Sequence, residues 1–244
     1  MTSGRIGTGT RATRALGAAA VALFGFLLVF GLVNSPADAV QRDSVRILYL
    51  HVPSAEMAYV AFAVAAVCSA AYLWRRTRSA AWDRVANASV ELGVVFTGLT
   101  LATGMMWGRI SWGVYWDWAD ARLVSTLLLF IMFAGYLAVR RLDGSDDQRA
   151  RRSAVVALVA ILDVPLVHFS VQWFQTTHPR SSLDTPGAID GTFRFLHFVG
   201  ITTFLLGYVW LMLHRNRVAM LEERVAGQDL AVAIAERQRE GVAG

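Results

Sequence analysis

Six long apolar runs constrain this chain more than any other feature. They cover approximately residues 16–33, 52–74, 85–106, 123–139, 154–173 and 193–213. Each approaches the length of about 20 residues that a helix needs to cross a lipid bilayer. Hydrophobic residues make up 55% of the sequence, which exceeds what a water-soluble domain of this size requires. The runs therefore predict an all-α membrane protein with six transmembrane helices, in which residues 1–244 form one integral membrane domain.

The arginines predict the orientation of the six helices. All 23 basic residues are arginine, and 17 of them lie in the two termini and in the segments after the second and fourth runs. Positively charged loops are enriched on the cytoplasmic side of membranes. We therefore expect cytoplasmic tails at residues 1–15 and 214–244, with residues 34–50, 107–122 and 174–192 facing outside. The net charge of +5 then reflects topology, and no aromatic-basic motif for nucleic acid is present.

The first run has features of both a membrane helix and a cleaved signal peptide. Arginines precede it, and Ala37-Asp38-Ala39 follows it in the manner of a cleavage site. Its apolar stretch is longer than the usual core of a signal peptide, about 7–15 residues. We expect a retained helix; cleavage would leave the topology of the other five unchanged.

Histidine is the residue type that could carry iron or haem chemistry in this chain. The one cysteine, Cys68, lies inside the second run, and the sequence has neither a C-x-x-C pair nor the C-x-x-C-H motif of covalent haem attachment. Four of the five histidines fall in the predicted outer half: His51, His168, His178 and His197. His51 and His178 lie near prolines on outer segments, and two such imidazoles could ligate haem iron from both faces. Each could equally be an ordinary residue of the membrane interface.

Tryptophan is concentrated in the segment Trp107–Leu123. It holds four of the eight tryptophans of the chain, namely Trp107, Trp112, Trp116 and Trp118. Tryptophan is enriched where membrane meets water, so the segment could be an aromatic anchor. On a helix lying in the interface, Trp112 and Trp116 would be one turn apart, and the neighbouring glycines would admit a flat ligand.

Charged residues within and after the tryptophans fit the second interpretation. Arg109 and Arg122 could pair with carboxylates such as haem propionates. Asp117 and Asp120 could orient these arginines, or cap the helix that is predicted to start near Arg122. From the residues alone, an aromatic anchor and a haem-like ligand site both remain open.

The order of these residues resembles the tryptophan-rich WWD signature of haem-handling proteins in cytochrome c maturation. That signature reads approximately W-G-x3-W-G-x-x-W-x-W-D-x-R-L. The matching residues are Trp107-Gly108, Trp112-Gly113, Trp116, Trp118, Asp120, Arg122 and Leu123. Ala119 is one residue more than the signature has, and the Ala-Arg-Leu that follows Asp120 favours Asp120 over Asp117 as its aspartate.

The resemblance extends over most of the chain and points to the cytochrome c maturation protein C family, the small six-span members of this superfamily. Tyr49–Ala55 is similar to the first histidine motif of that family. His178 matches its second external histidine, with Thr177 and Pro179 in place of the usual leucine and glutamine. His178 is preferred over His168 because it lies on the loop.

What the resemblance implies is a haem-delivery protein and not an enzyme. Haem b would rest non-covalently on the external tryptophan surface, with His51 and His178 as its two iron ligands. The other implied site residues are Trp107, Trp112, Trp116, Trp118, Asp120 and Arg122. The implied partners are a haem chaperone that receives the haem, the ATPase and permease subunits of an ABC transporter, and a small single-span subunit, in the lipid bilayer of a bacterial plasma membrane. The chain lacks a G-x-x-x-x-G-K-[ST] loop, so ATP hydrolysis would belong to a partner.

Two other functions compete with haem delivery. An electron-transfer cytochrome of the b type would place two histidines within facing helices, which selects His168 and His197. A transmembrane haem transporter would need a continuous polar path, for which Asn87, Glu91, Asp163 and Gln172 are the only indications in the runs.

Overall fold

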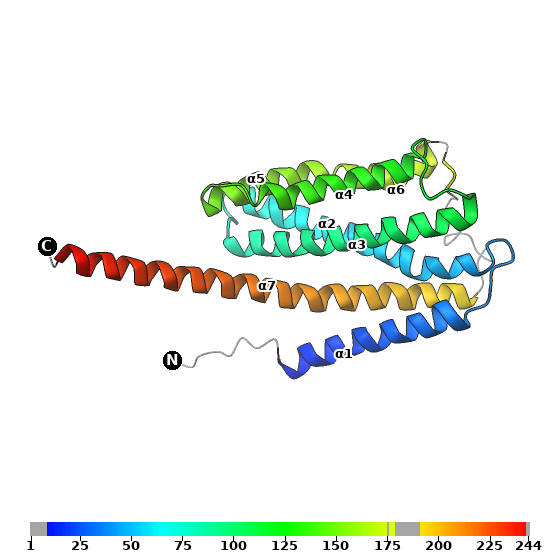
Figure 1. Ribbon diagram of the computed structural model, residues 1–244, viewed down its shortest axis with the longest axis horizontal. Coiled ribbons are helices and arrows are strands. Elements are labelled where there is room, and N and C mark those ends of the chain that lie inside the picture. Colours follow the sequence, from blue (N-terminus) through cyan, green and yellow to red (C-terminus); the bar gives the residue numbers. More distant parts are fainter. Residues whose placement is uncertain (1–8, 175, 179–190, 243–244) are drawn as a thin grey trace.

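The structure, a computed structural model, describes residues 9–174, 176–178 and 191–242, apart from the side chains of residues 236 and 239–242. Within these ranges every regular element is a helix (Figure 1). In chain order the elements are α1 (Arg11–Phe26), the π-helical η1 (Leu27–Asn34), the 3₁₀ turn η2 (Asp43–Ile47), α2 (Leu48–Leu73), α3 (Ala80–Trp112), α4 (Ala121–Val139), α5 (Asp146–Ala160), α6 (Asp163–Trp173) and α7 (Gly191–Val242).

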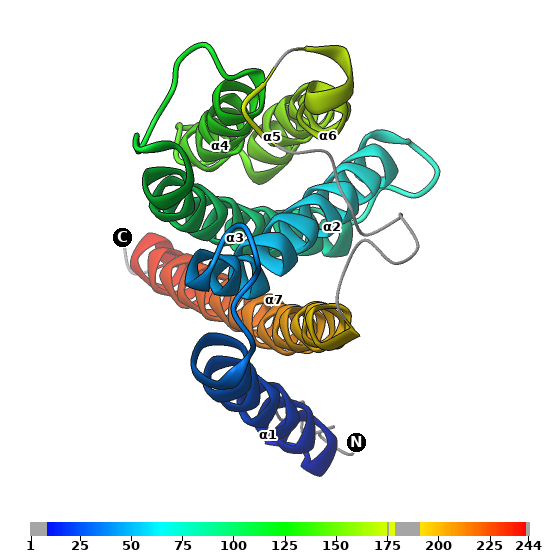
Figure 2. The ribbon, with the colours of Figure 1, turned by 90° about the vertical axis from the view of Figure 1, so that its right-hand side faces the viewer.

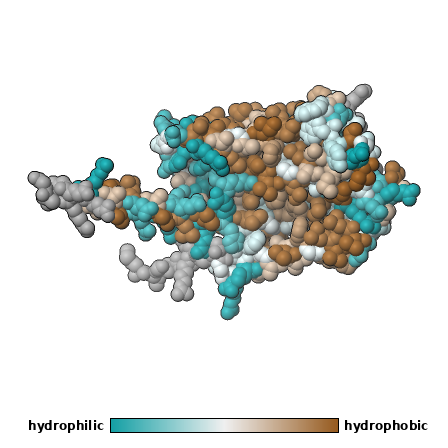
Figure 3. All heavy atoms as spheres, viewed as in Figure 1, coloured by the Kyte–Doolittle hydropathy of each residue, from teal (hydrophilic) through white to brown (hydrophobic). Residues whose placement is uncertain are grey.

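Six stretches of the described residues are long and apolar enough to cross a membrane. They are Arg11–Asn34, Asp43–Leu73, Ala80–Trp112, Ala121–Val139, Asp146–Trp173 and Gly191–Ala235. The helices lie side by side along one direction (Figure 1), and hydrophobic side chains form a broad band between more hydrophilic ends (Figure 3). The prediction of an all-α membrane protein with six transmembrane helices is confirmed.

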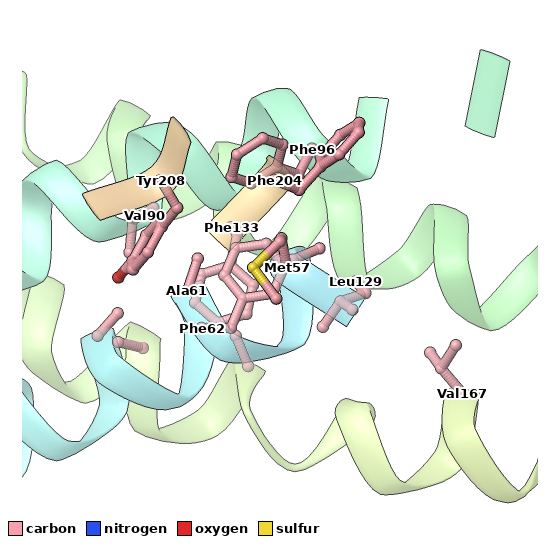
Figure 4. Packing of buried hydrophobic residues seen from close by; sticks show 14 of the residues in the cluster. Met57, Ala61, Phe62, Val90, Phe96, Leu129, Phe133, Val167, Phe204 and Tyr208 are labelled. Carbon is pink, nitrogen blue, oxygen red and sulfur yellow. The ribbon is translucent and has the colours of Figure 1, made fainter. Parts of the chain in front are cut away.

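Helices α2 and α3 form the centre of the bundle. Helix α7 packs against both of them, α1 packs on α7, and α4, α5 and α6 cover the opposite side (Figure 2). In the core, Phe62 of α2 stacks on Phe133 of α4 with 3.7 Å between ring centroids, and both rings are fully buried (Figure 4). The hydroxyls of Ser89 and Tyr208, 2.7 Å apart, join α3 to α7. This packing fixes the relative positions of the helix ends that carry the site.

Two of the predicted runs differ from the helices that contain them. The fifth is divided, because α5 ends at Ala160 and α6 begins at Asp163. Pro165 lacks the N–H that would bond to the carbonyl of Ile161, so it belongs in the first turn of a new helix. The sixth run continues as α7 far beyond its apolar part, and the last turns of this helix project from the bundle (Figure 1).

A side chain at Gly93 is expected to destabilise the centre of the bundle. A Cβ atom there would lie 2.4 Å from Cε1 of Phe62, whose ring is held by the stack on Phe133. Overpacking of this kind costs about 1–3 kcal/mol. Gly93→Ala should therefore lower the Tm in detergent, whereas Gly135→Ala, where a Cβ meets nothing within 4 Å, should not. Equal Tm values for the two variants would contradict this packing argument.

Candidate functional site

The tryptophan segment lies at one end of the bundle, together with the chain between η1 and α2 and the chain after α6 (Figure 1). We call this end the tryptophan end. Trp112 and Trp116 do not share one helix, as they would on a helix lying in the interface. Helix α3 runs without interruption through Trp107 to Trp112 and ends there, because Gly113 adopts a left-handed conformation with φ +80°. Residues 113–120 then form an irregular loop, which separates Trp107 and Trp112 from the other two tryptophans.

The additional residue Ala119 is accommodated by a turn. The carboxylate of Asp117 accepts a hydrogen bond from the backbone N–H of Ala119 at 2.9 Å, and the carbonyl of Asp117 accepts one from the N–H of Asp120. This turn places Asp120 at the N-terminus of α4. There its side chain accepts hydrogen bonds from the backbone of Arg122 and Leu123 at 3.0 and 3.1 Å, so Asp120 caps the helix as predicted.

Asp120 is also the centre of a hydrogen-bond network that reaches the chain after α6. Its carboxylate accepts hydrogen bonds from the backbone N–H and the hydroxyl of Thr177, at 3.0 and 2.8 Å, and from Nδ1 of His178 at 3.1 Å. Only 1% of Asp120 is exposed. Burial raises the pKa of this carboxyl, but the hydrogen bonds from Thr177, Leu123 and His178 more than offset burial and hold the pKa below its usual range. Asp120 is therefore a buried carboxylate that ties His178 to the start of α4.

His178 lies against the aromatic rings at the end of α3. Its ring centroid is 4.6 Å from that of Trp112 and 6.4 Å from that of Trp107, and the two indoles pack edge to face at 4.9 Å. Burial lowers the pKa of His178, and the hydrogen bond and charge of Asp120 offset only part of this effect. At neutral pH the imidazole is therefore neutral, which is the form that binds a metal.

His51 approaches the same end from α2. Its Nδ1 lies 3.0 Å from the backbone carbonyl of Thr100 and 3.1 Å from the hydroxyl of Thr103, both on α3. The ring lies directly over Gly104, where a Cβ would be 2.9 Å from Cε1 of the imidazole. The structure thus brings both predicted ligands to the same end of α3.

The sequence predicted His51 on an outer segment before the second helix, whereas the structure places it inside α2. Helix α2 begins at Leu48, so His51 is the fourth residue of the helix and Pro53 lies inside it. The 3₁₀ turn η2 leads into α2, and the buried side chains of Val45 and Tyr49 hold this turn against the bundle. The extra turn before the proline is therefore stabilised by packing, and His51 is fixed on a rigid element whereas His178 lies outside any helix.

Both imidazoles have the same hydrogen-bonding arrangement. A backbone carbonyl and a carboxylate can only accept, so Nδ1 of His51 and Nδ1 of His178 must each carry the proton. In both rings Nε2 then holds the free lone pair, and within the described part of the chain it makes no hydrogen bond. An acceptor on one nitrogen that orients the other towards a metal is typical of metal-binding histidines.

The remaining predicted residues lie outside this cluster. Trp116 and Trp118 form a second pair on the loop, with centroids 5.4 Å apart; Nε1 of Trp116 is buried without a partner in the described residues. Arg122 points towards α6, where it donates to Ser170 Oγ and to the carbonyl of His168, each at 3.2 Å. Arg109 donates to the carbonyl of Gly113.

The two histidines selected for a b-type cytochrome do not face each other. His168 is exposed on α6, with its ring 6.2 Å from that of Tyr59. His197 is buried on α7, and its Nε2 lies 3.6 Å from Glu56 of α2. Over the described residues, α6 packs mainly on α4 and has no extensive contact with α7. This geometry disfavours a haem held between His168 and His197.

The fold and the site define a class: multi-pass α-helical membrane proteins with two oriented histidines and a cluster of tryptophans at one end. Comparison with known proteins narrows this class. The sequence model of the family described as Heme exporter protein C matches residues 5–231. The chain therefore belongs to the Heme exporter protein C family, which confirms the resemblance seen in the WWD signature.

Individual relatives agree with this assignment. Over 205 residues the chain is 37% identical to Heme exporter protein C of Bradyrhizobium diazoefficiens, which covers 82% of this chain and 76% of the relative. The corresponding protein of Haemophilus influenzae is 36% identical over 208 residues, 82% of this chain and 81% of its own. That of Escherichia coli K12 is 34% identical over 217 residues, 86% and 84% of the two chains.

Proposed function

We propose that this chain binds haem b at its tryptophan end and presents it to a haem chaperone during cytochrome c maturation. One observation carries the proposal: Nδ1 of both His51 and His178 is held by an oxygen acceptor, which leaves two Nε2 atoms to ligate one iron. Haem is then cargo, and the chain acts as a carrier within an ABC-type exporter and not as an enzyme.

The described residues fit such a ligand in two further respects. Gly104 leaves room for the imidazole of His51 to lie directly against α3, which keeps this ring at the tryptophan end. The buried N–H of Trp116 lacks a partner among the described residues, and a haem propionate would provide an acceptor for it. Trp112, which is half-buried, offers apolar ring surface to the macrocycle, and the buried Trp107 packs behind it at 4.9 Å.

The distribution of arginine supports the proposed orientation. The loops between α2 and α3 and between α4 and α5 lie at the end of the bundle opposite the tryptophans. Together with the first turns of α3 and α5, they carry nine of the 23 arginines. If that end faces the cytoplasm, the tryptophan end faces outside and both termini are cytoplasmic. The ATPase and permease subunits and a small single-span subunit would then complete the exporter.

Haem transfer from the purified protein tests the proposal. The protein from haem-replete membranes should show the Soret and α bands of low-spin haem with two nitrogen ligands. Mixed with a soluble haem chaperone that has been freed of haem, it should lose this absorbance while the chaperone gains it. Absence of haem from the protein as isolated, together with failure to bind added haem, would exclude a haem carrier. Retention of haem in the presence of the chaperone would instead favour a resident redox group.

A further inference from the structure

The indole of Trp107 is anchored by Gln41, which no sequence motif marks as a site residue. Its Nε1–H donates to Oε1 of Gln41 at 2.9 Å, across the tryptophan end from α3 to the chain between η1 and η2. Trp107 is only 6% exposed, so this hydrogen bond joins a largely buried ring to Gln41. The amide of Gln41 therefore fixes the orientation of the ring.

Gln41 is presented by a tight turn formed by Asp38–Arg42. The carboxylate of Asp38 accepts hydrogen bonds from the backbone of Val40 and Gln41 at 2.8 and 2.7 Å. The backbones of Asp38 and Arg42 bond to each other in both directions, at 3.1 and 3.0 Å. The hydrogen bonds from the backbone of Gln41 and Val40 hold the pKa of the Asp38 carboxyl below its usual range. These hydrogen bonds thus fix the backbone from which the side chain of Gln41 reaches Trp107.

The turn closes at the cost of backbone strain. Arg42 has φ +54° and ψ −136°, and among the described residues it is the one residue other than glycine with a positive φ. Side chains with a Cβ rarely adopt this conformation, and it persists only where surrounding contacts enforce it. On one side the turn faces a cavity of about 490 Å³, lined by Val40, Arg42, Ser44, Ile47 and Ile110 among others. Hydrogen bonds within residues 38–42 hold the turn, together with the contact between Gln41 and Trp107.

Trp107 connects this turn to the proposed haem site. Its ring packs edge to face on Trp112 at 4.9 Å, and Trp112 in turn packs on His178 at 4.6 Å. We propose that Gln41 is a positioning residue that orients Trp107 within the Trp107–Trp112–His178 cluster and thereby slows the loss of haem from the site. This inference rests on the proposed haem-binding function.

Faster loss of haem should follow from removal of the Gln41 acceptor. Gln41→Met removes the acceptor at nearly constant size, and transfer of haem to apomyoglobin should become about fivefold faster, the scale of one hydrogen bond to a buried donor. Gln41→Glu keeps an acceptor oxygen and should restore the wild-type rate. Gln228→Met, the same change on the exposed part of α7, is the matched control.

The measurement combines transfer kinetics with the absorption spectrum and the Tm of each variant. Faster transfer from Gln41→Met at an unchanged Tm, with rescue by Gln41→Glu, supports positioning over a general loss of stability. Identical transfer rates for wild type and Gln41→Met, in a protein that loses haem on His178→Ala, would overturn this inference alone. If the His51→Ala and His178→Ala variants keep their haem, the proposed function itself fails.

Discussion

Alanine in place of His51 or His178 is expected to remove most of the haem from the purified protein. Each imidazole offers one Nε2 lone pair, and the loss of either would leave the iron with a single protein ligand at an open site. We expect the Soret absorbance per protein to fall at least about tenfold, corresponding to a loss of about 1.4 kcal/mol or more of binding free energy. Exogenous imidazole should restore part of the absorbance, because it replaces the missing ligand.

The other membrane histidines provide the control for this experiment. His168→Ala removes an exposed ring, and His197→Ala removes a ring that faces Glu56, so both variants should keep the wild-type spectrum. The opposite pattern, with haem lost from these two variants and retained by His51→Ala and His178→Ala, would support an electron-transfer cytochrome and refute haem presentation.

Asp120→Ala is expected to have the second largest effect, and to act on the fold and on the site together. The substitution removes the N-terminal cap of α4, which typically costs about 0.5–2 kcal/mol. It also leaves the donors of Thr177 and His178 without their buried acceptor, at roughly 1–3 kcal/mol for each unsatisfied group. The Tm should fall by several degrees, and haem should be lost because Nδ1 of His178 no longer holds the ring in place.

Asp120→Asn separates these two contributions. An asparagine oxygen can still cap α4, but its amide cannot accept all the hydrogen bonds that the carboxylate now receives. We therefore expect a Tm closer to wild type together with weaker haem binding. Asp117→Ala is the matched control, since among the residues that the structure describes Asp117 accepts hydrogen bonds only within its own turn. Wild-type haem content in Asp120→Asn would show that the contact with His178 is dispensable.

Sequence patterns predicted the spans well because membrane crossing depends on local composition. Apolar runs located all six helices, and Asp120 before an apolar run indicated a cap that the structure confirms. Where the predictions failed, the start or end of a helix depends on a single backbone conformation or on a packing contact. Gly113 ends α3 in the left-handed region and prevents an interfacial helix, and η2 extends α2 past Pro53.

The internal arrangement of the site could not be read from spacing. Asp120 and His178 are 58 residues apart, and His51 bonds to a backbone carbonyl 49 residues away, which carries no signature in the sequence. The same is true of Gln41 and Trp107, which are separated by 66 residues. The residue types were visible as candidates, but which nitrogen of each histidine is free depends on contacts between helices.

Helix α7 is one continuous helix that runs between the two ends of the molecule. At about 1.5 Å per residue, its 52 residues form a rod of roughly 78 Å. Near the tryptophan end, Gly200 of this rod lies directly against Pro53, two residues from His51; near the opposite end, Glu223 pairs with Arg84 at 2.8 Å. A protein that binds the projecting turns would therefore contact a continuous helix that also packs beside His51, the proposed iron ligand, at the opposite end of the bundle.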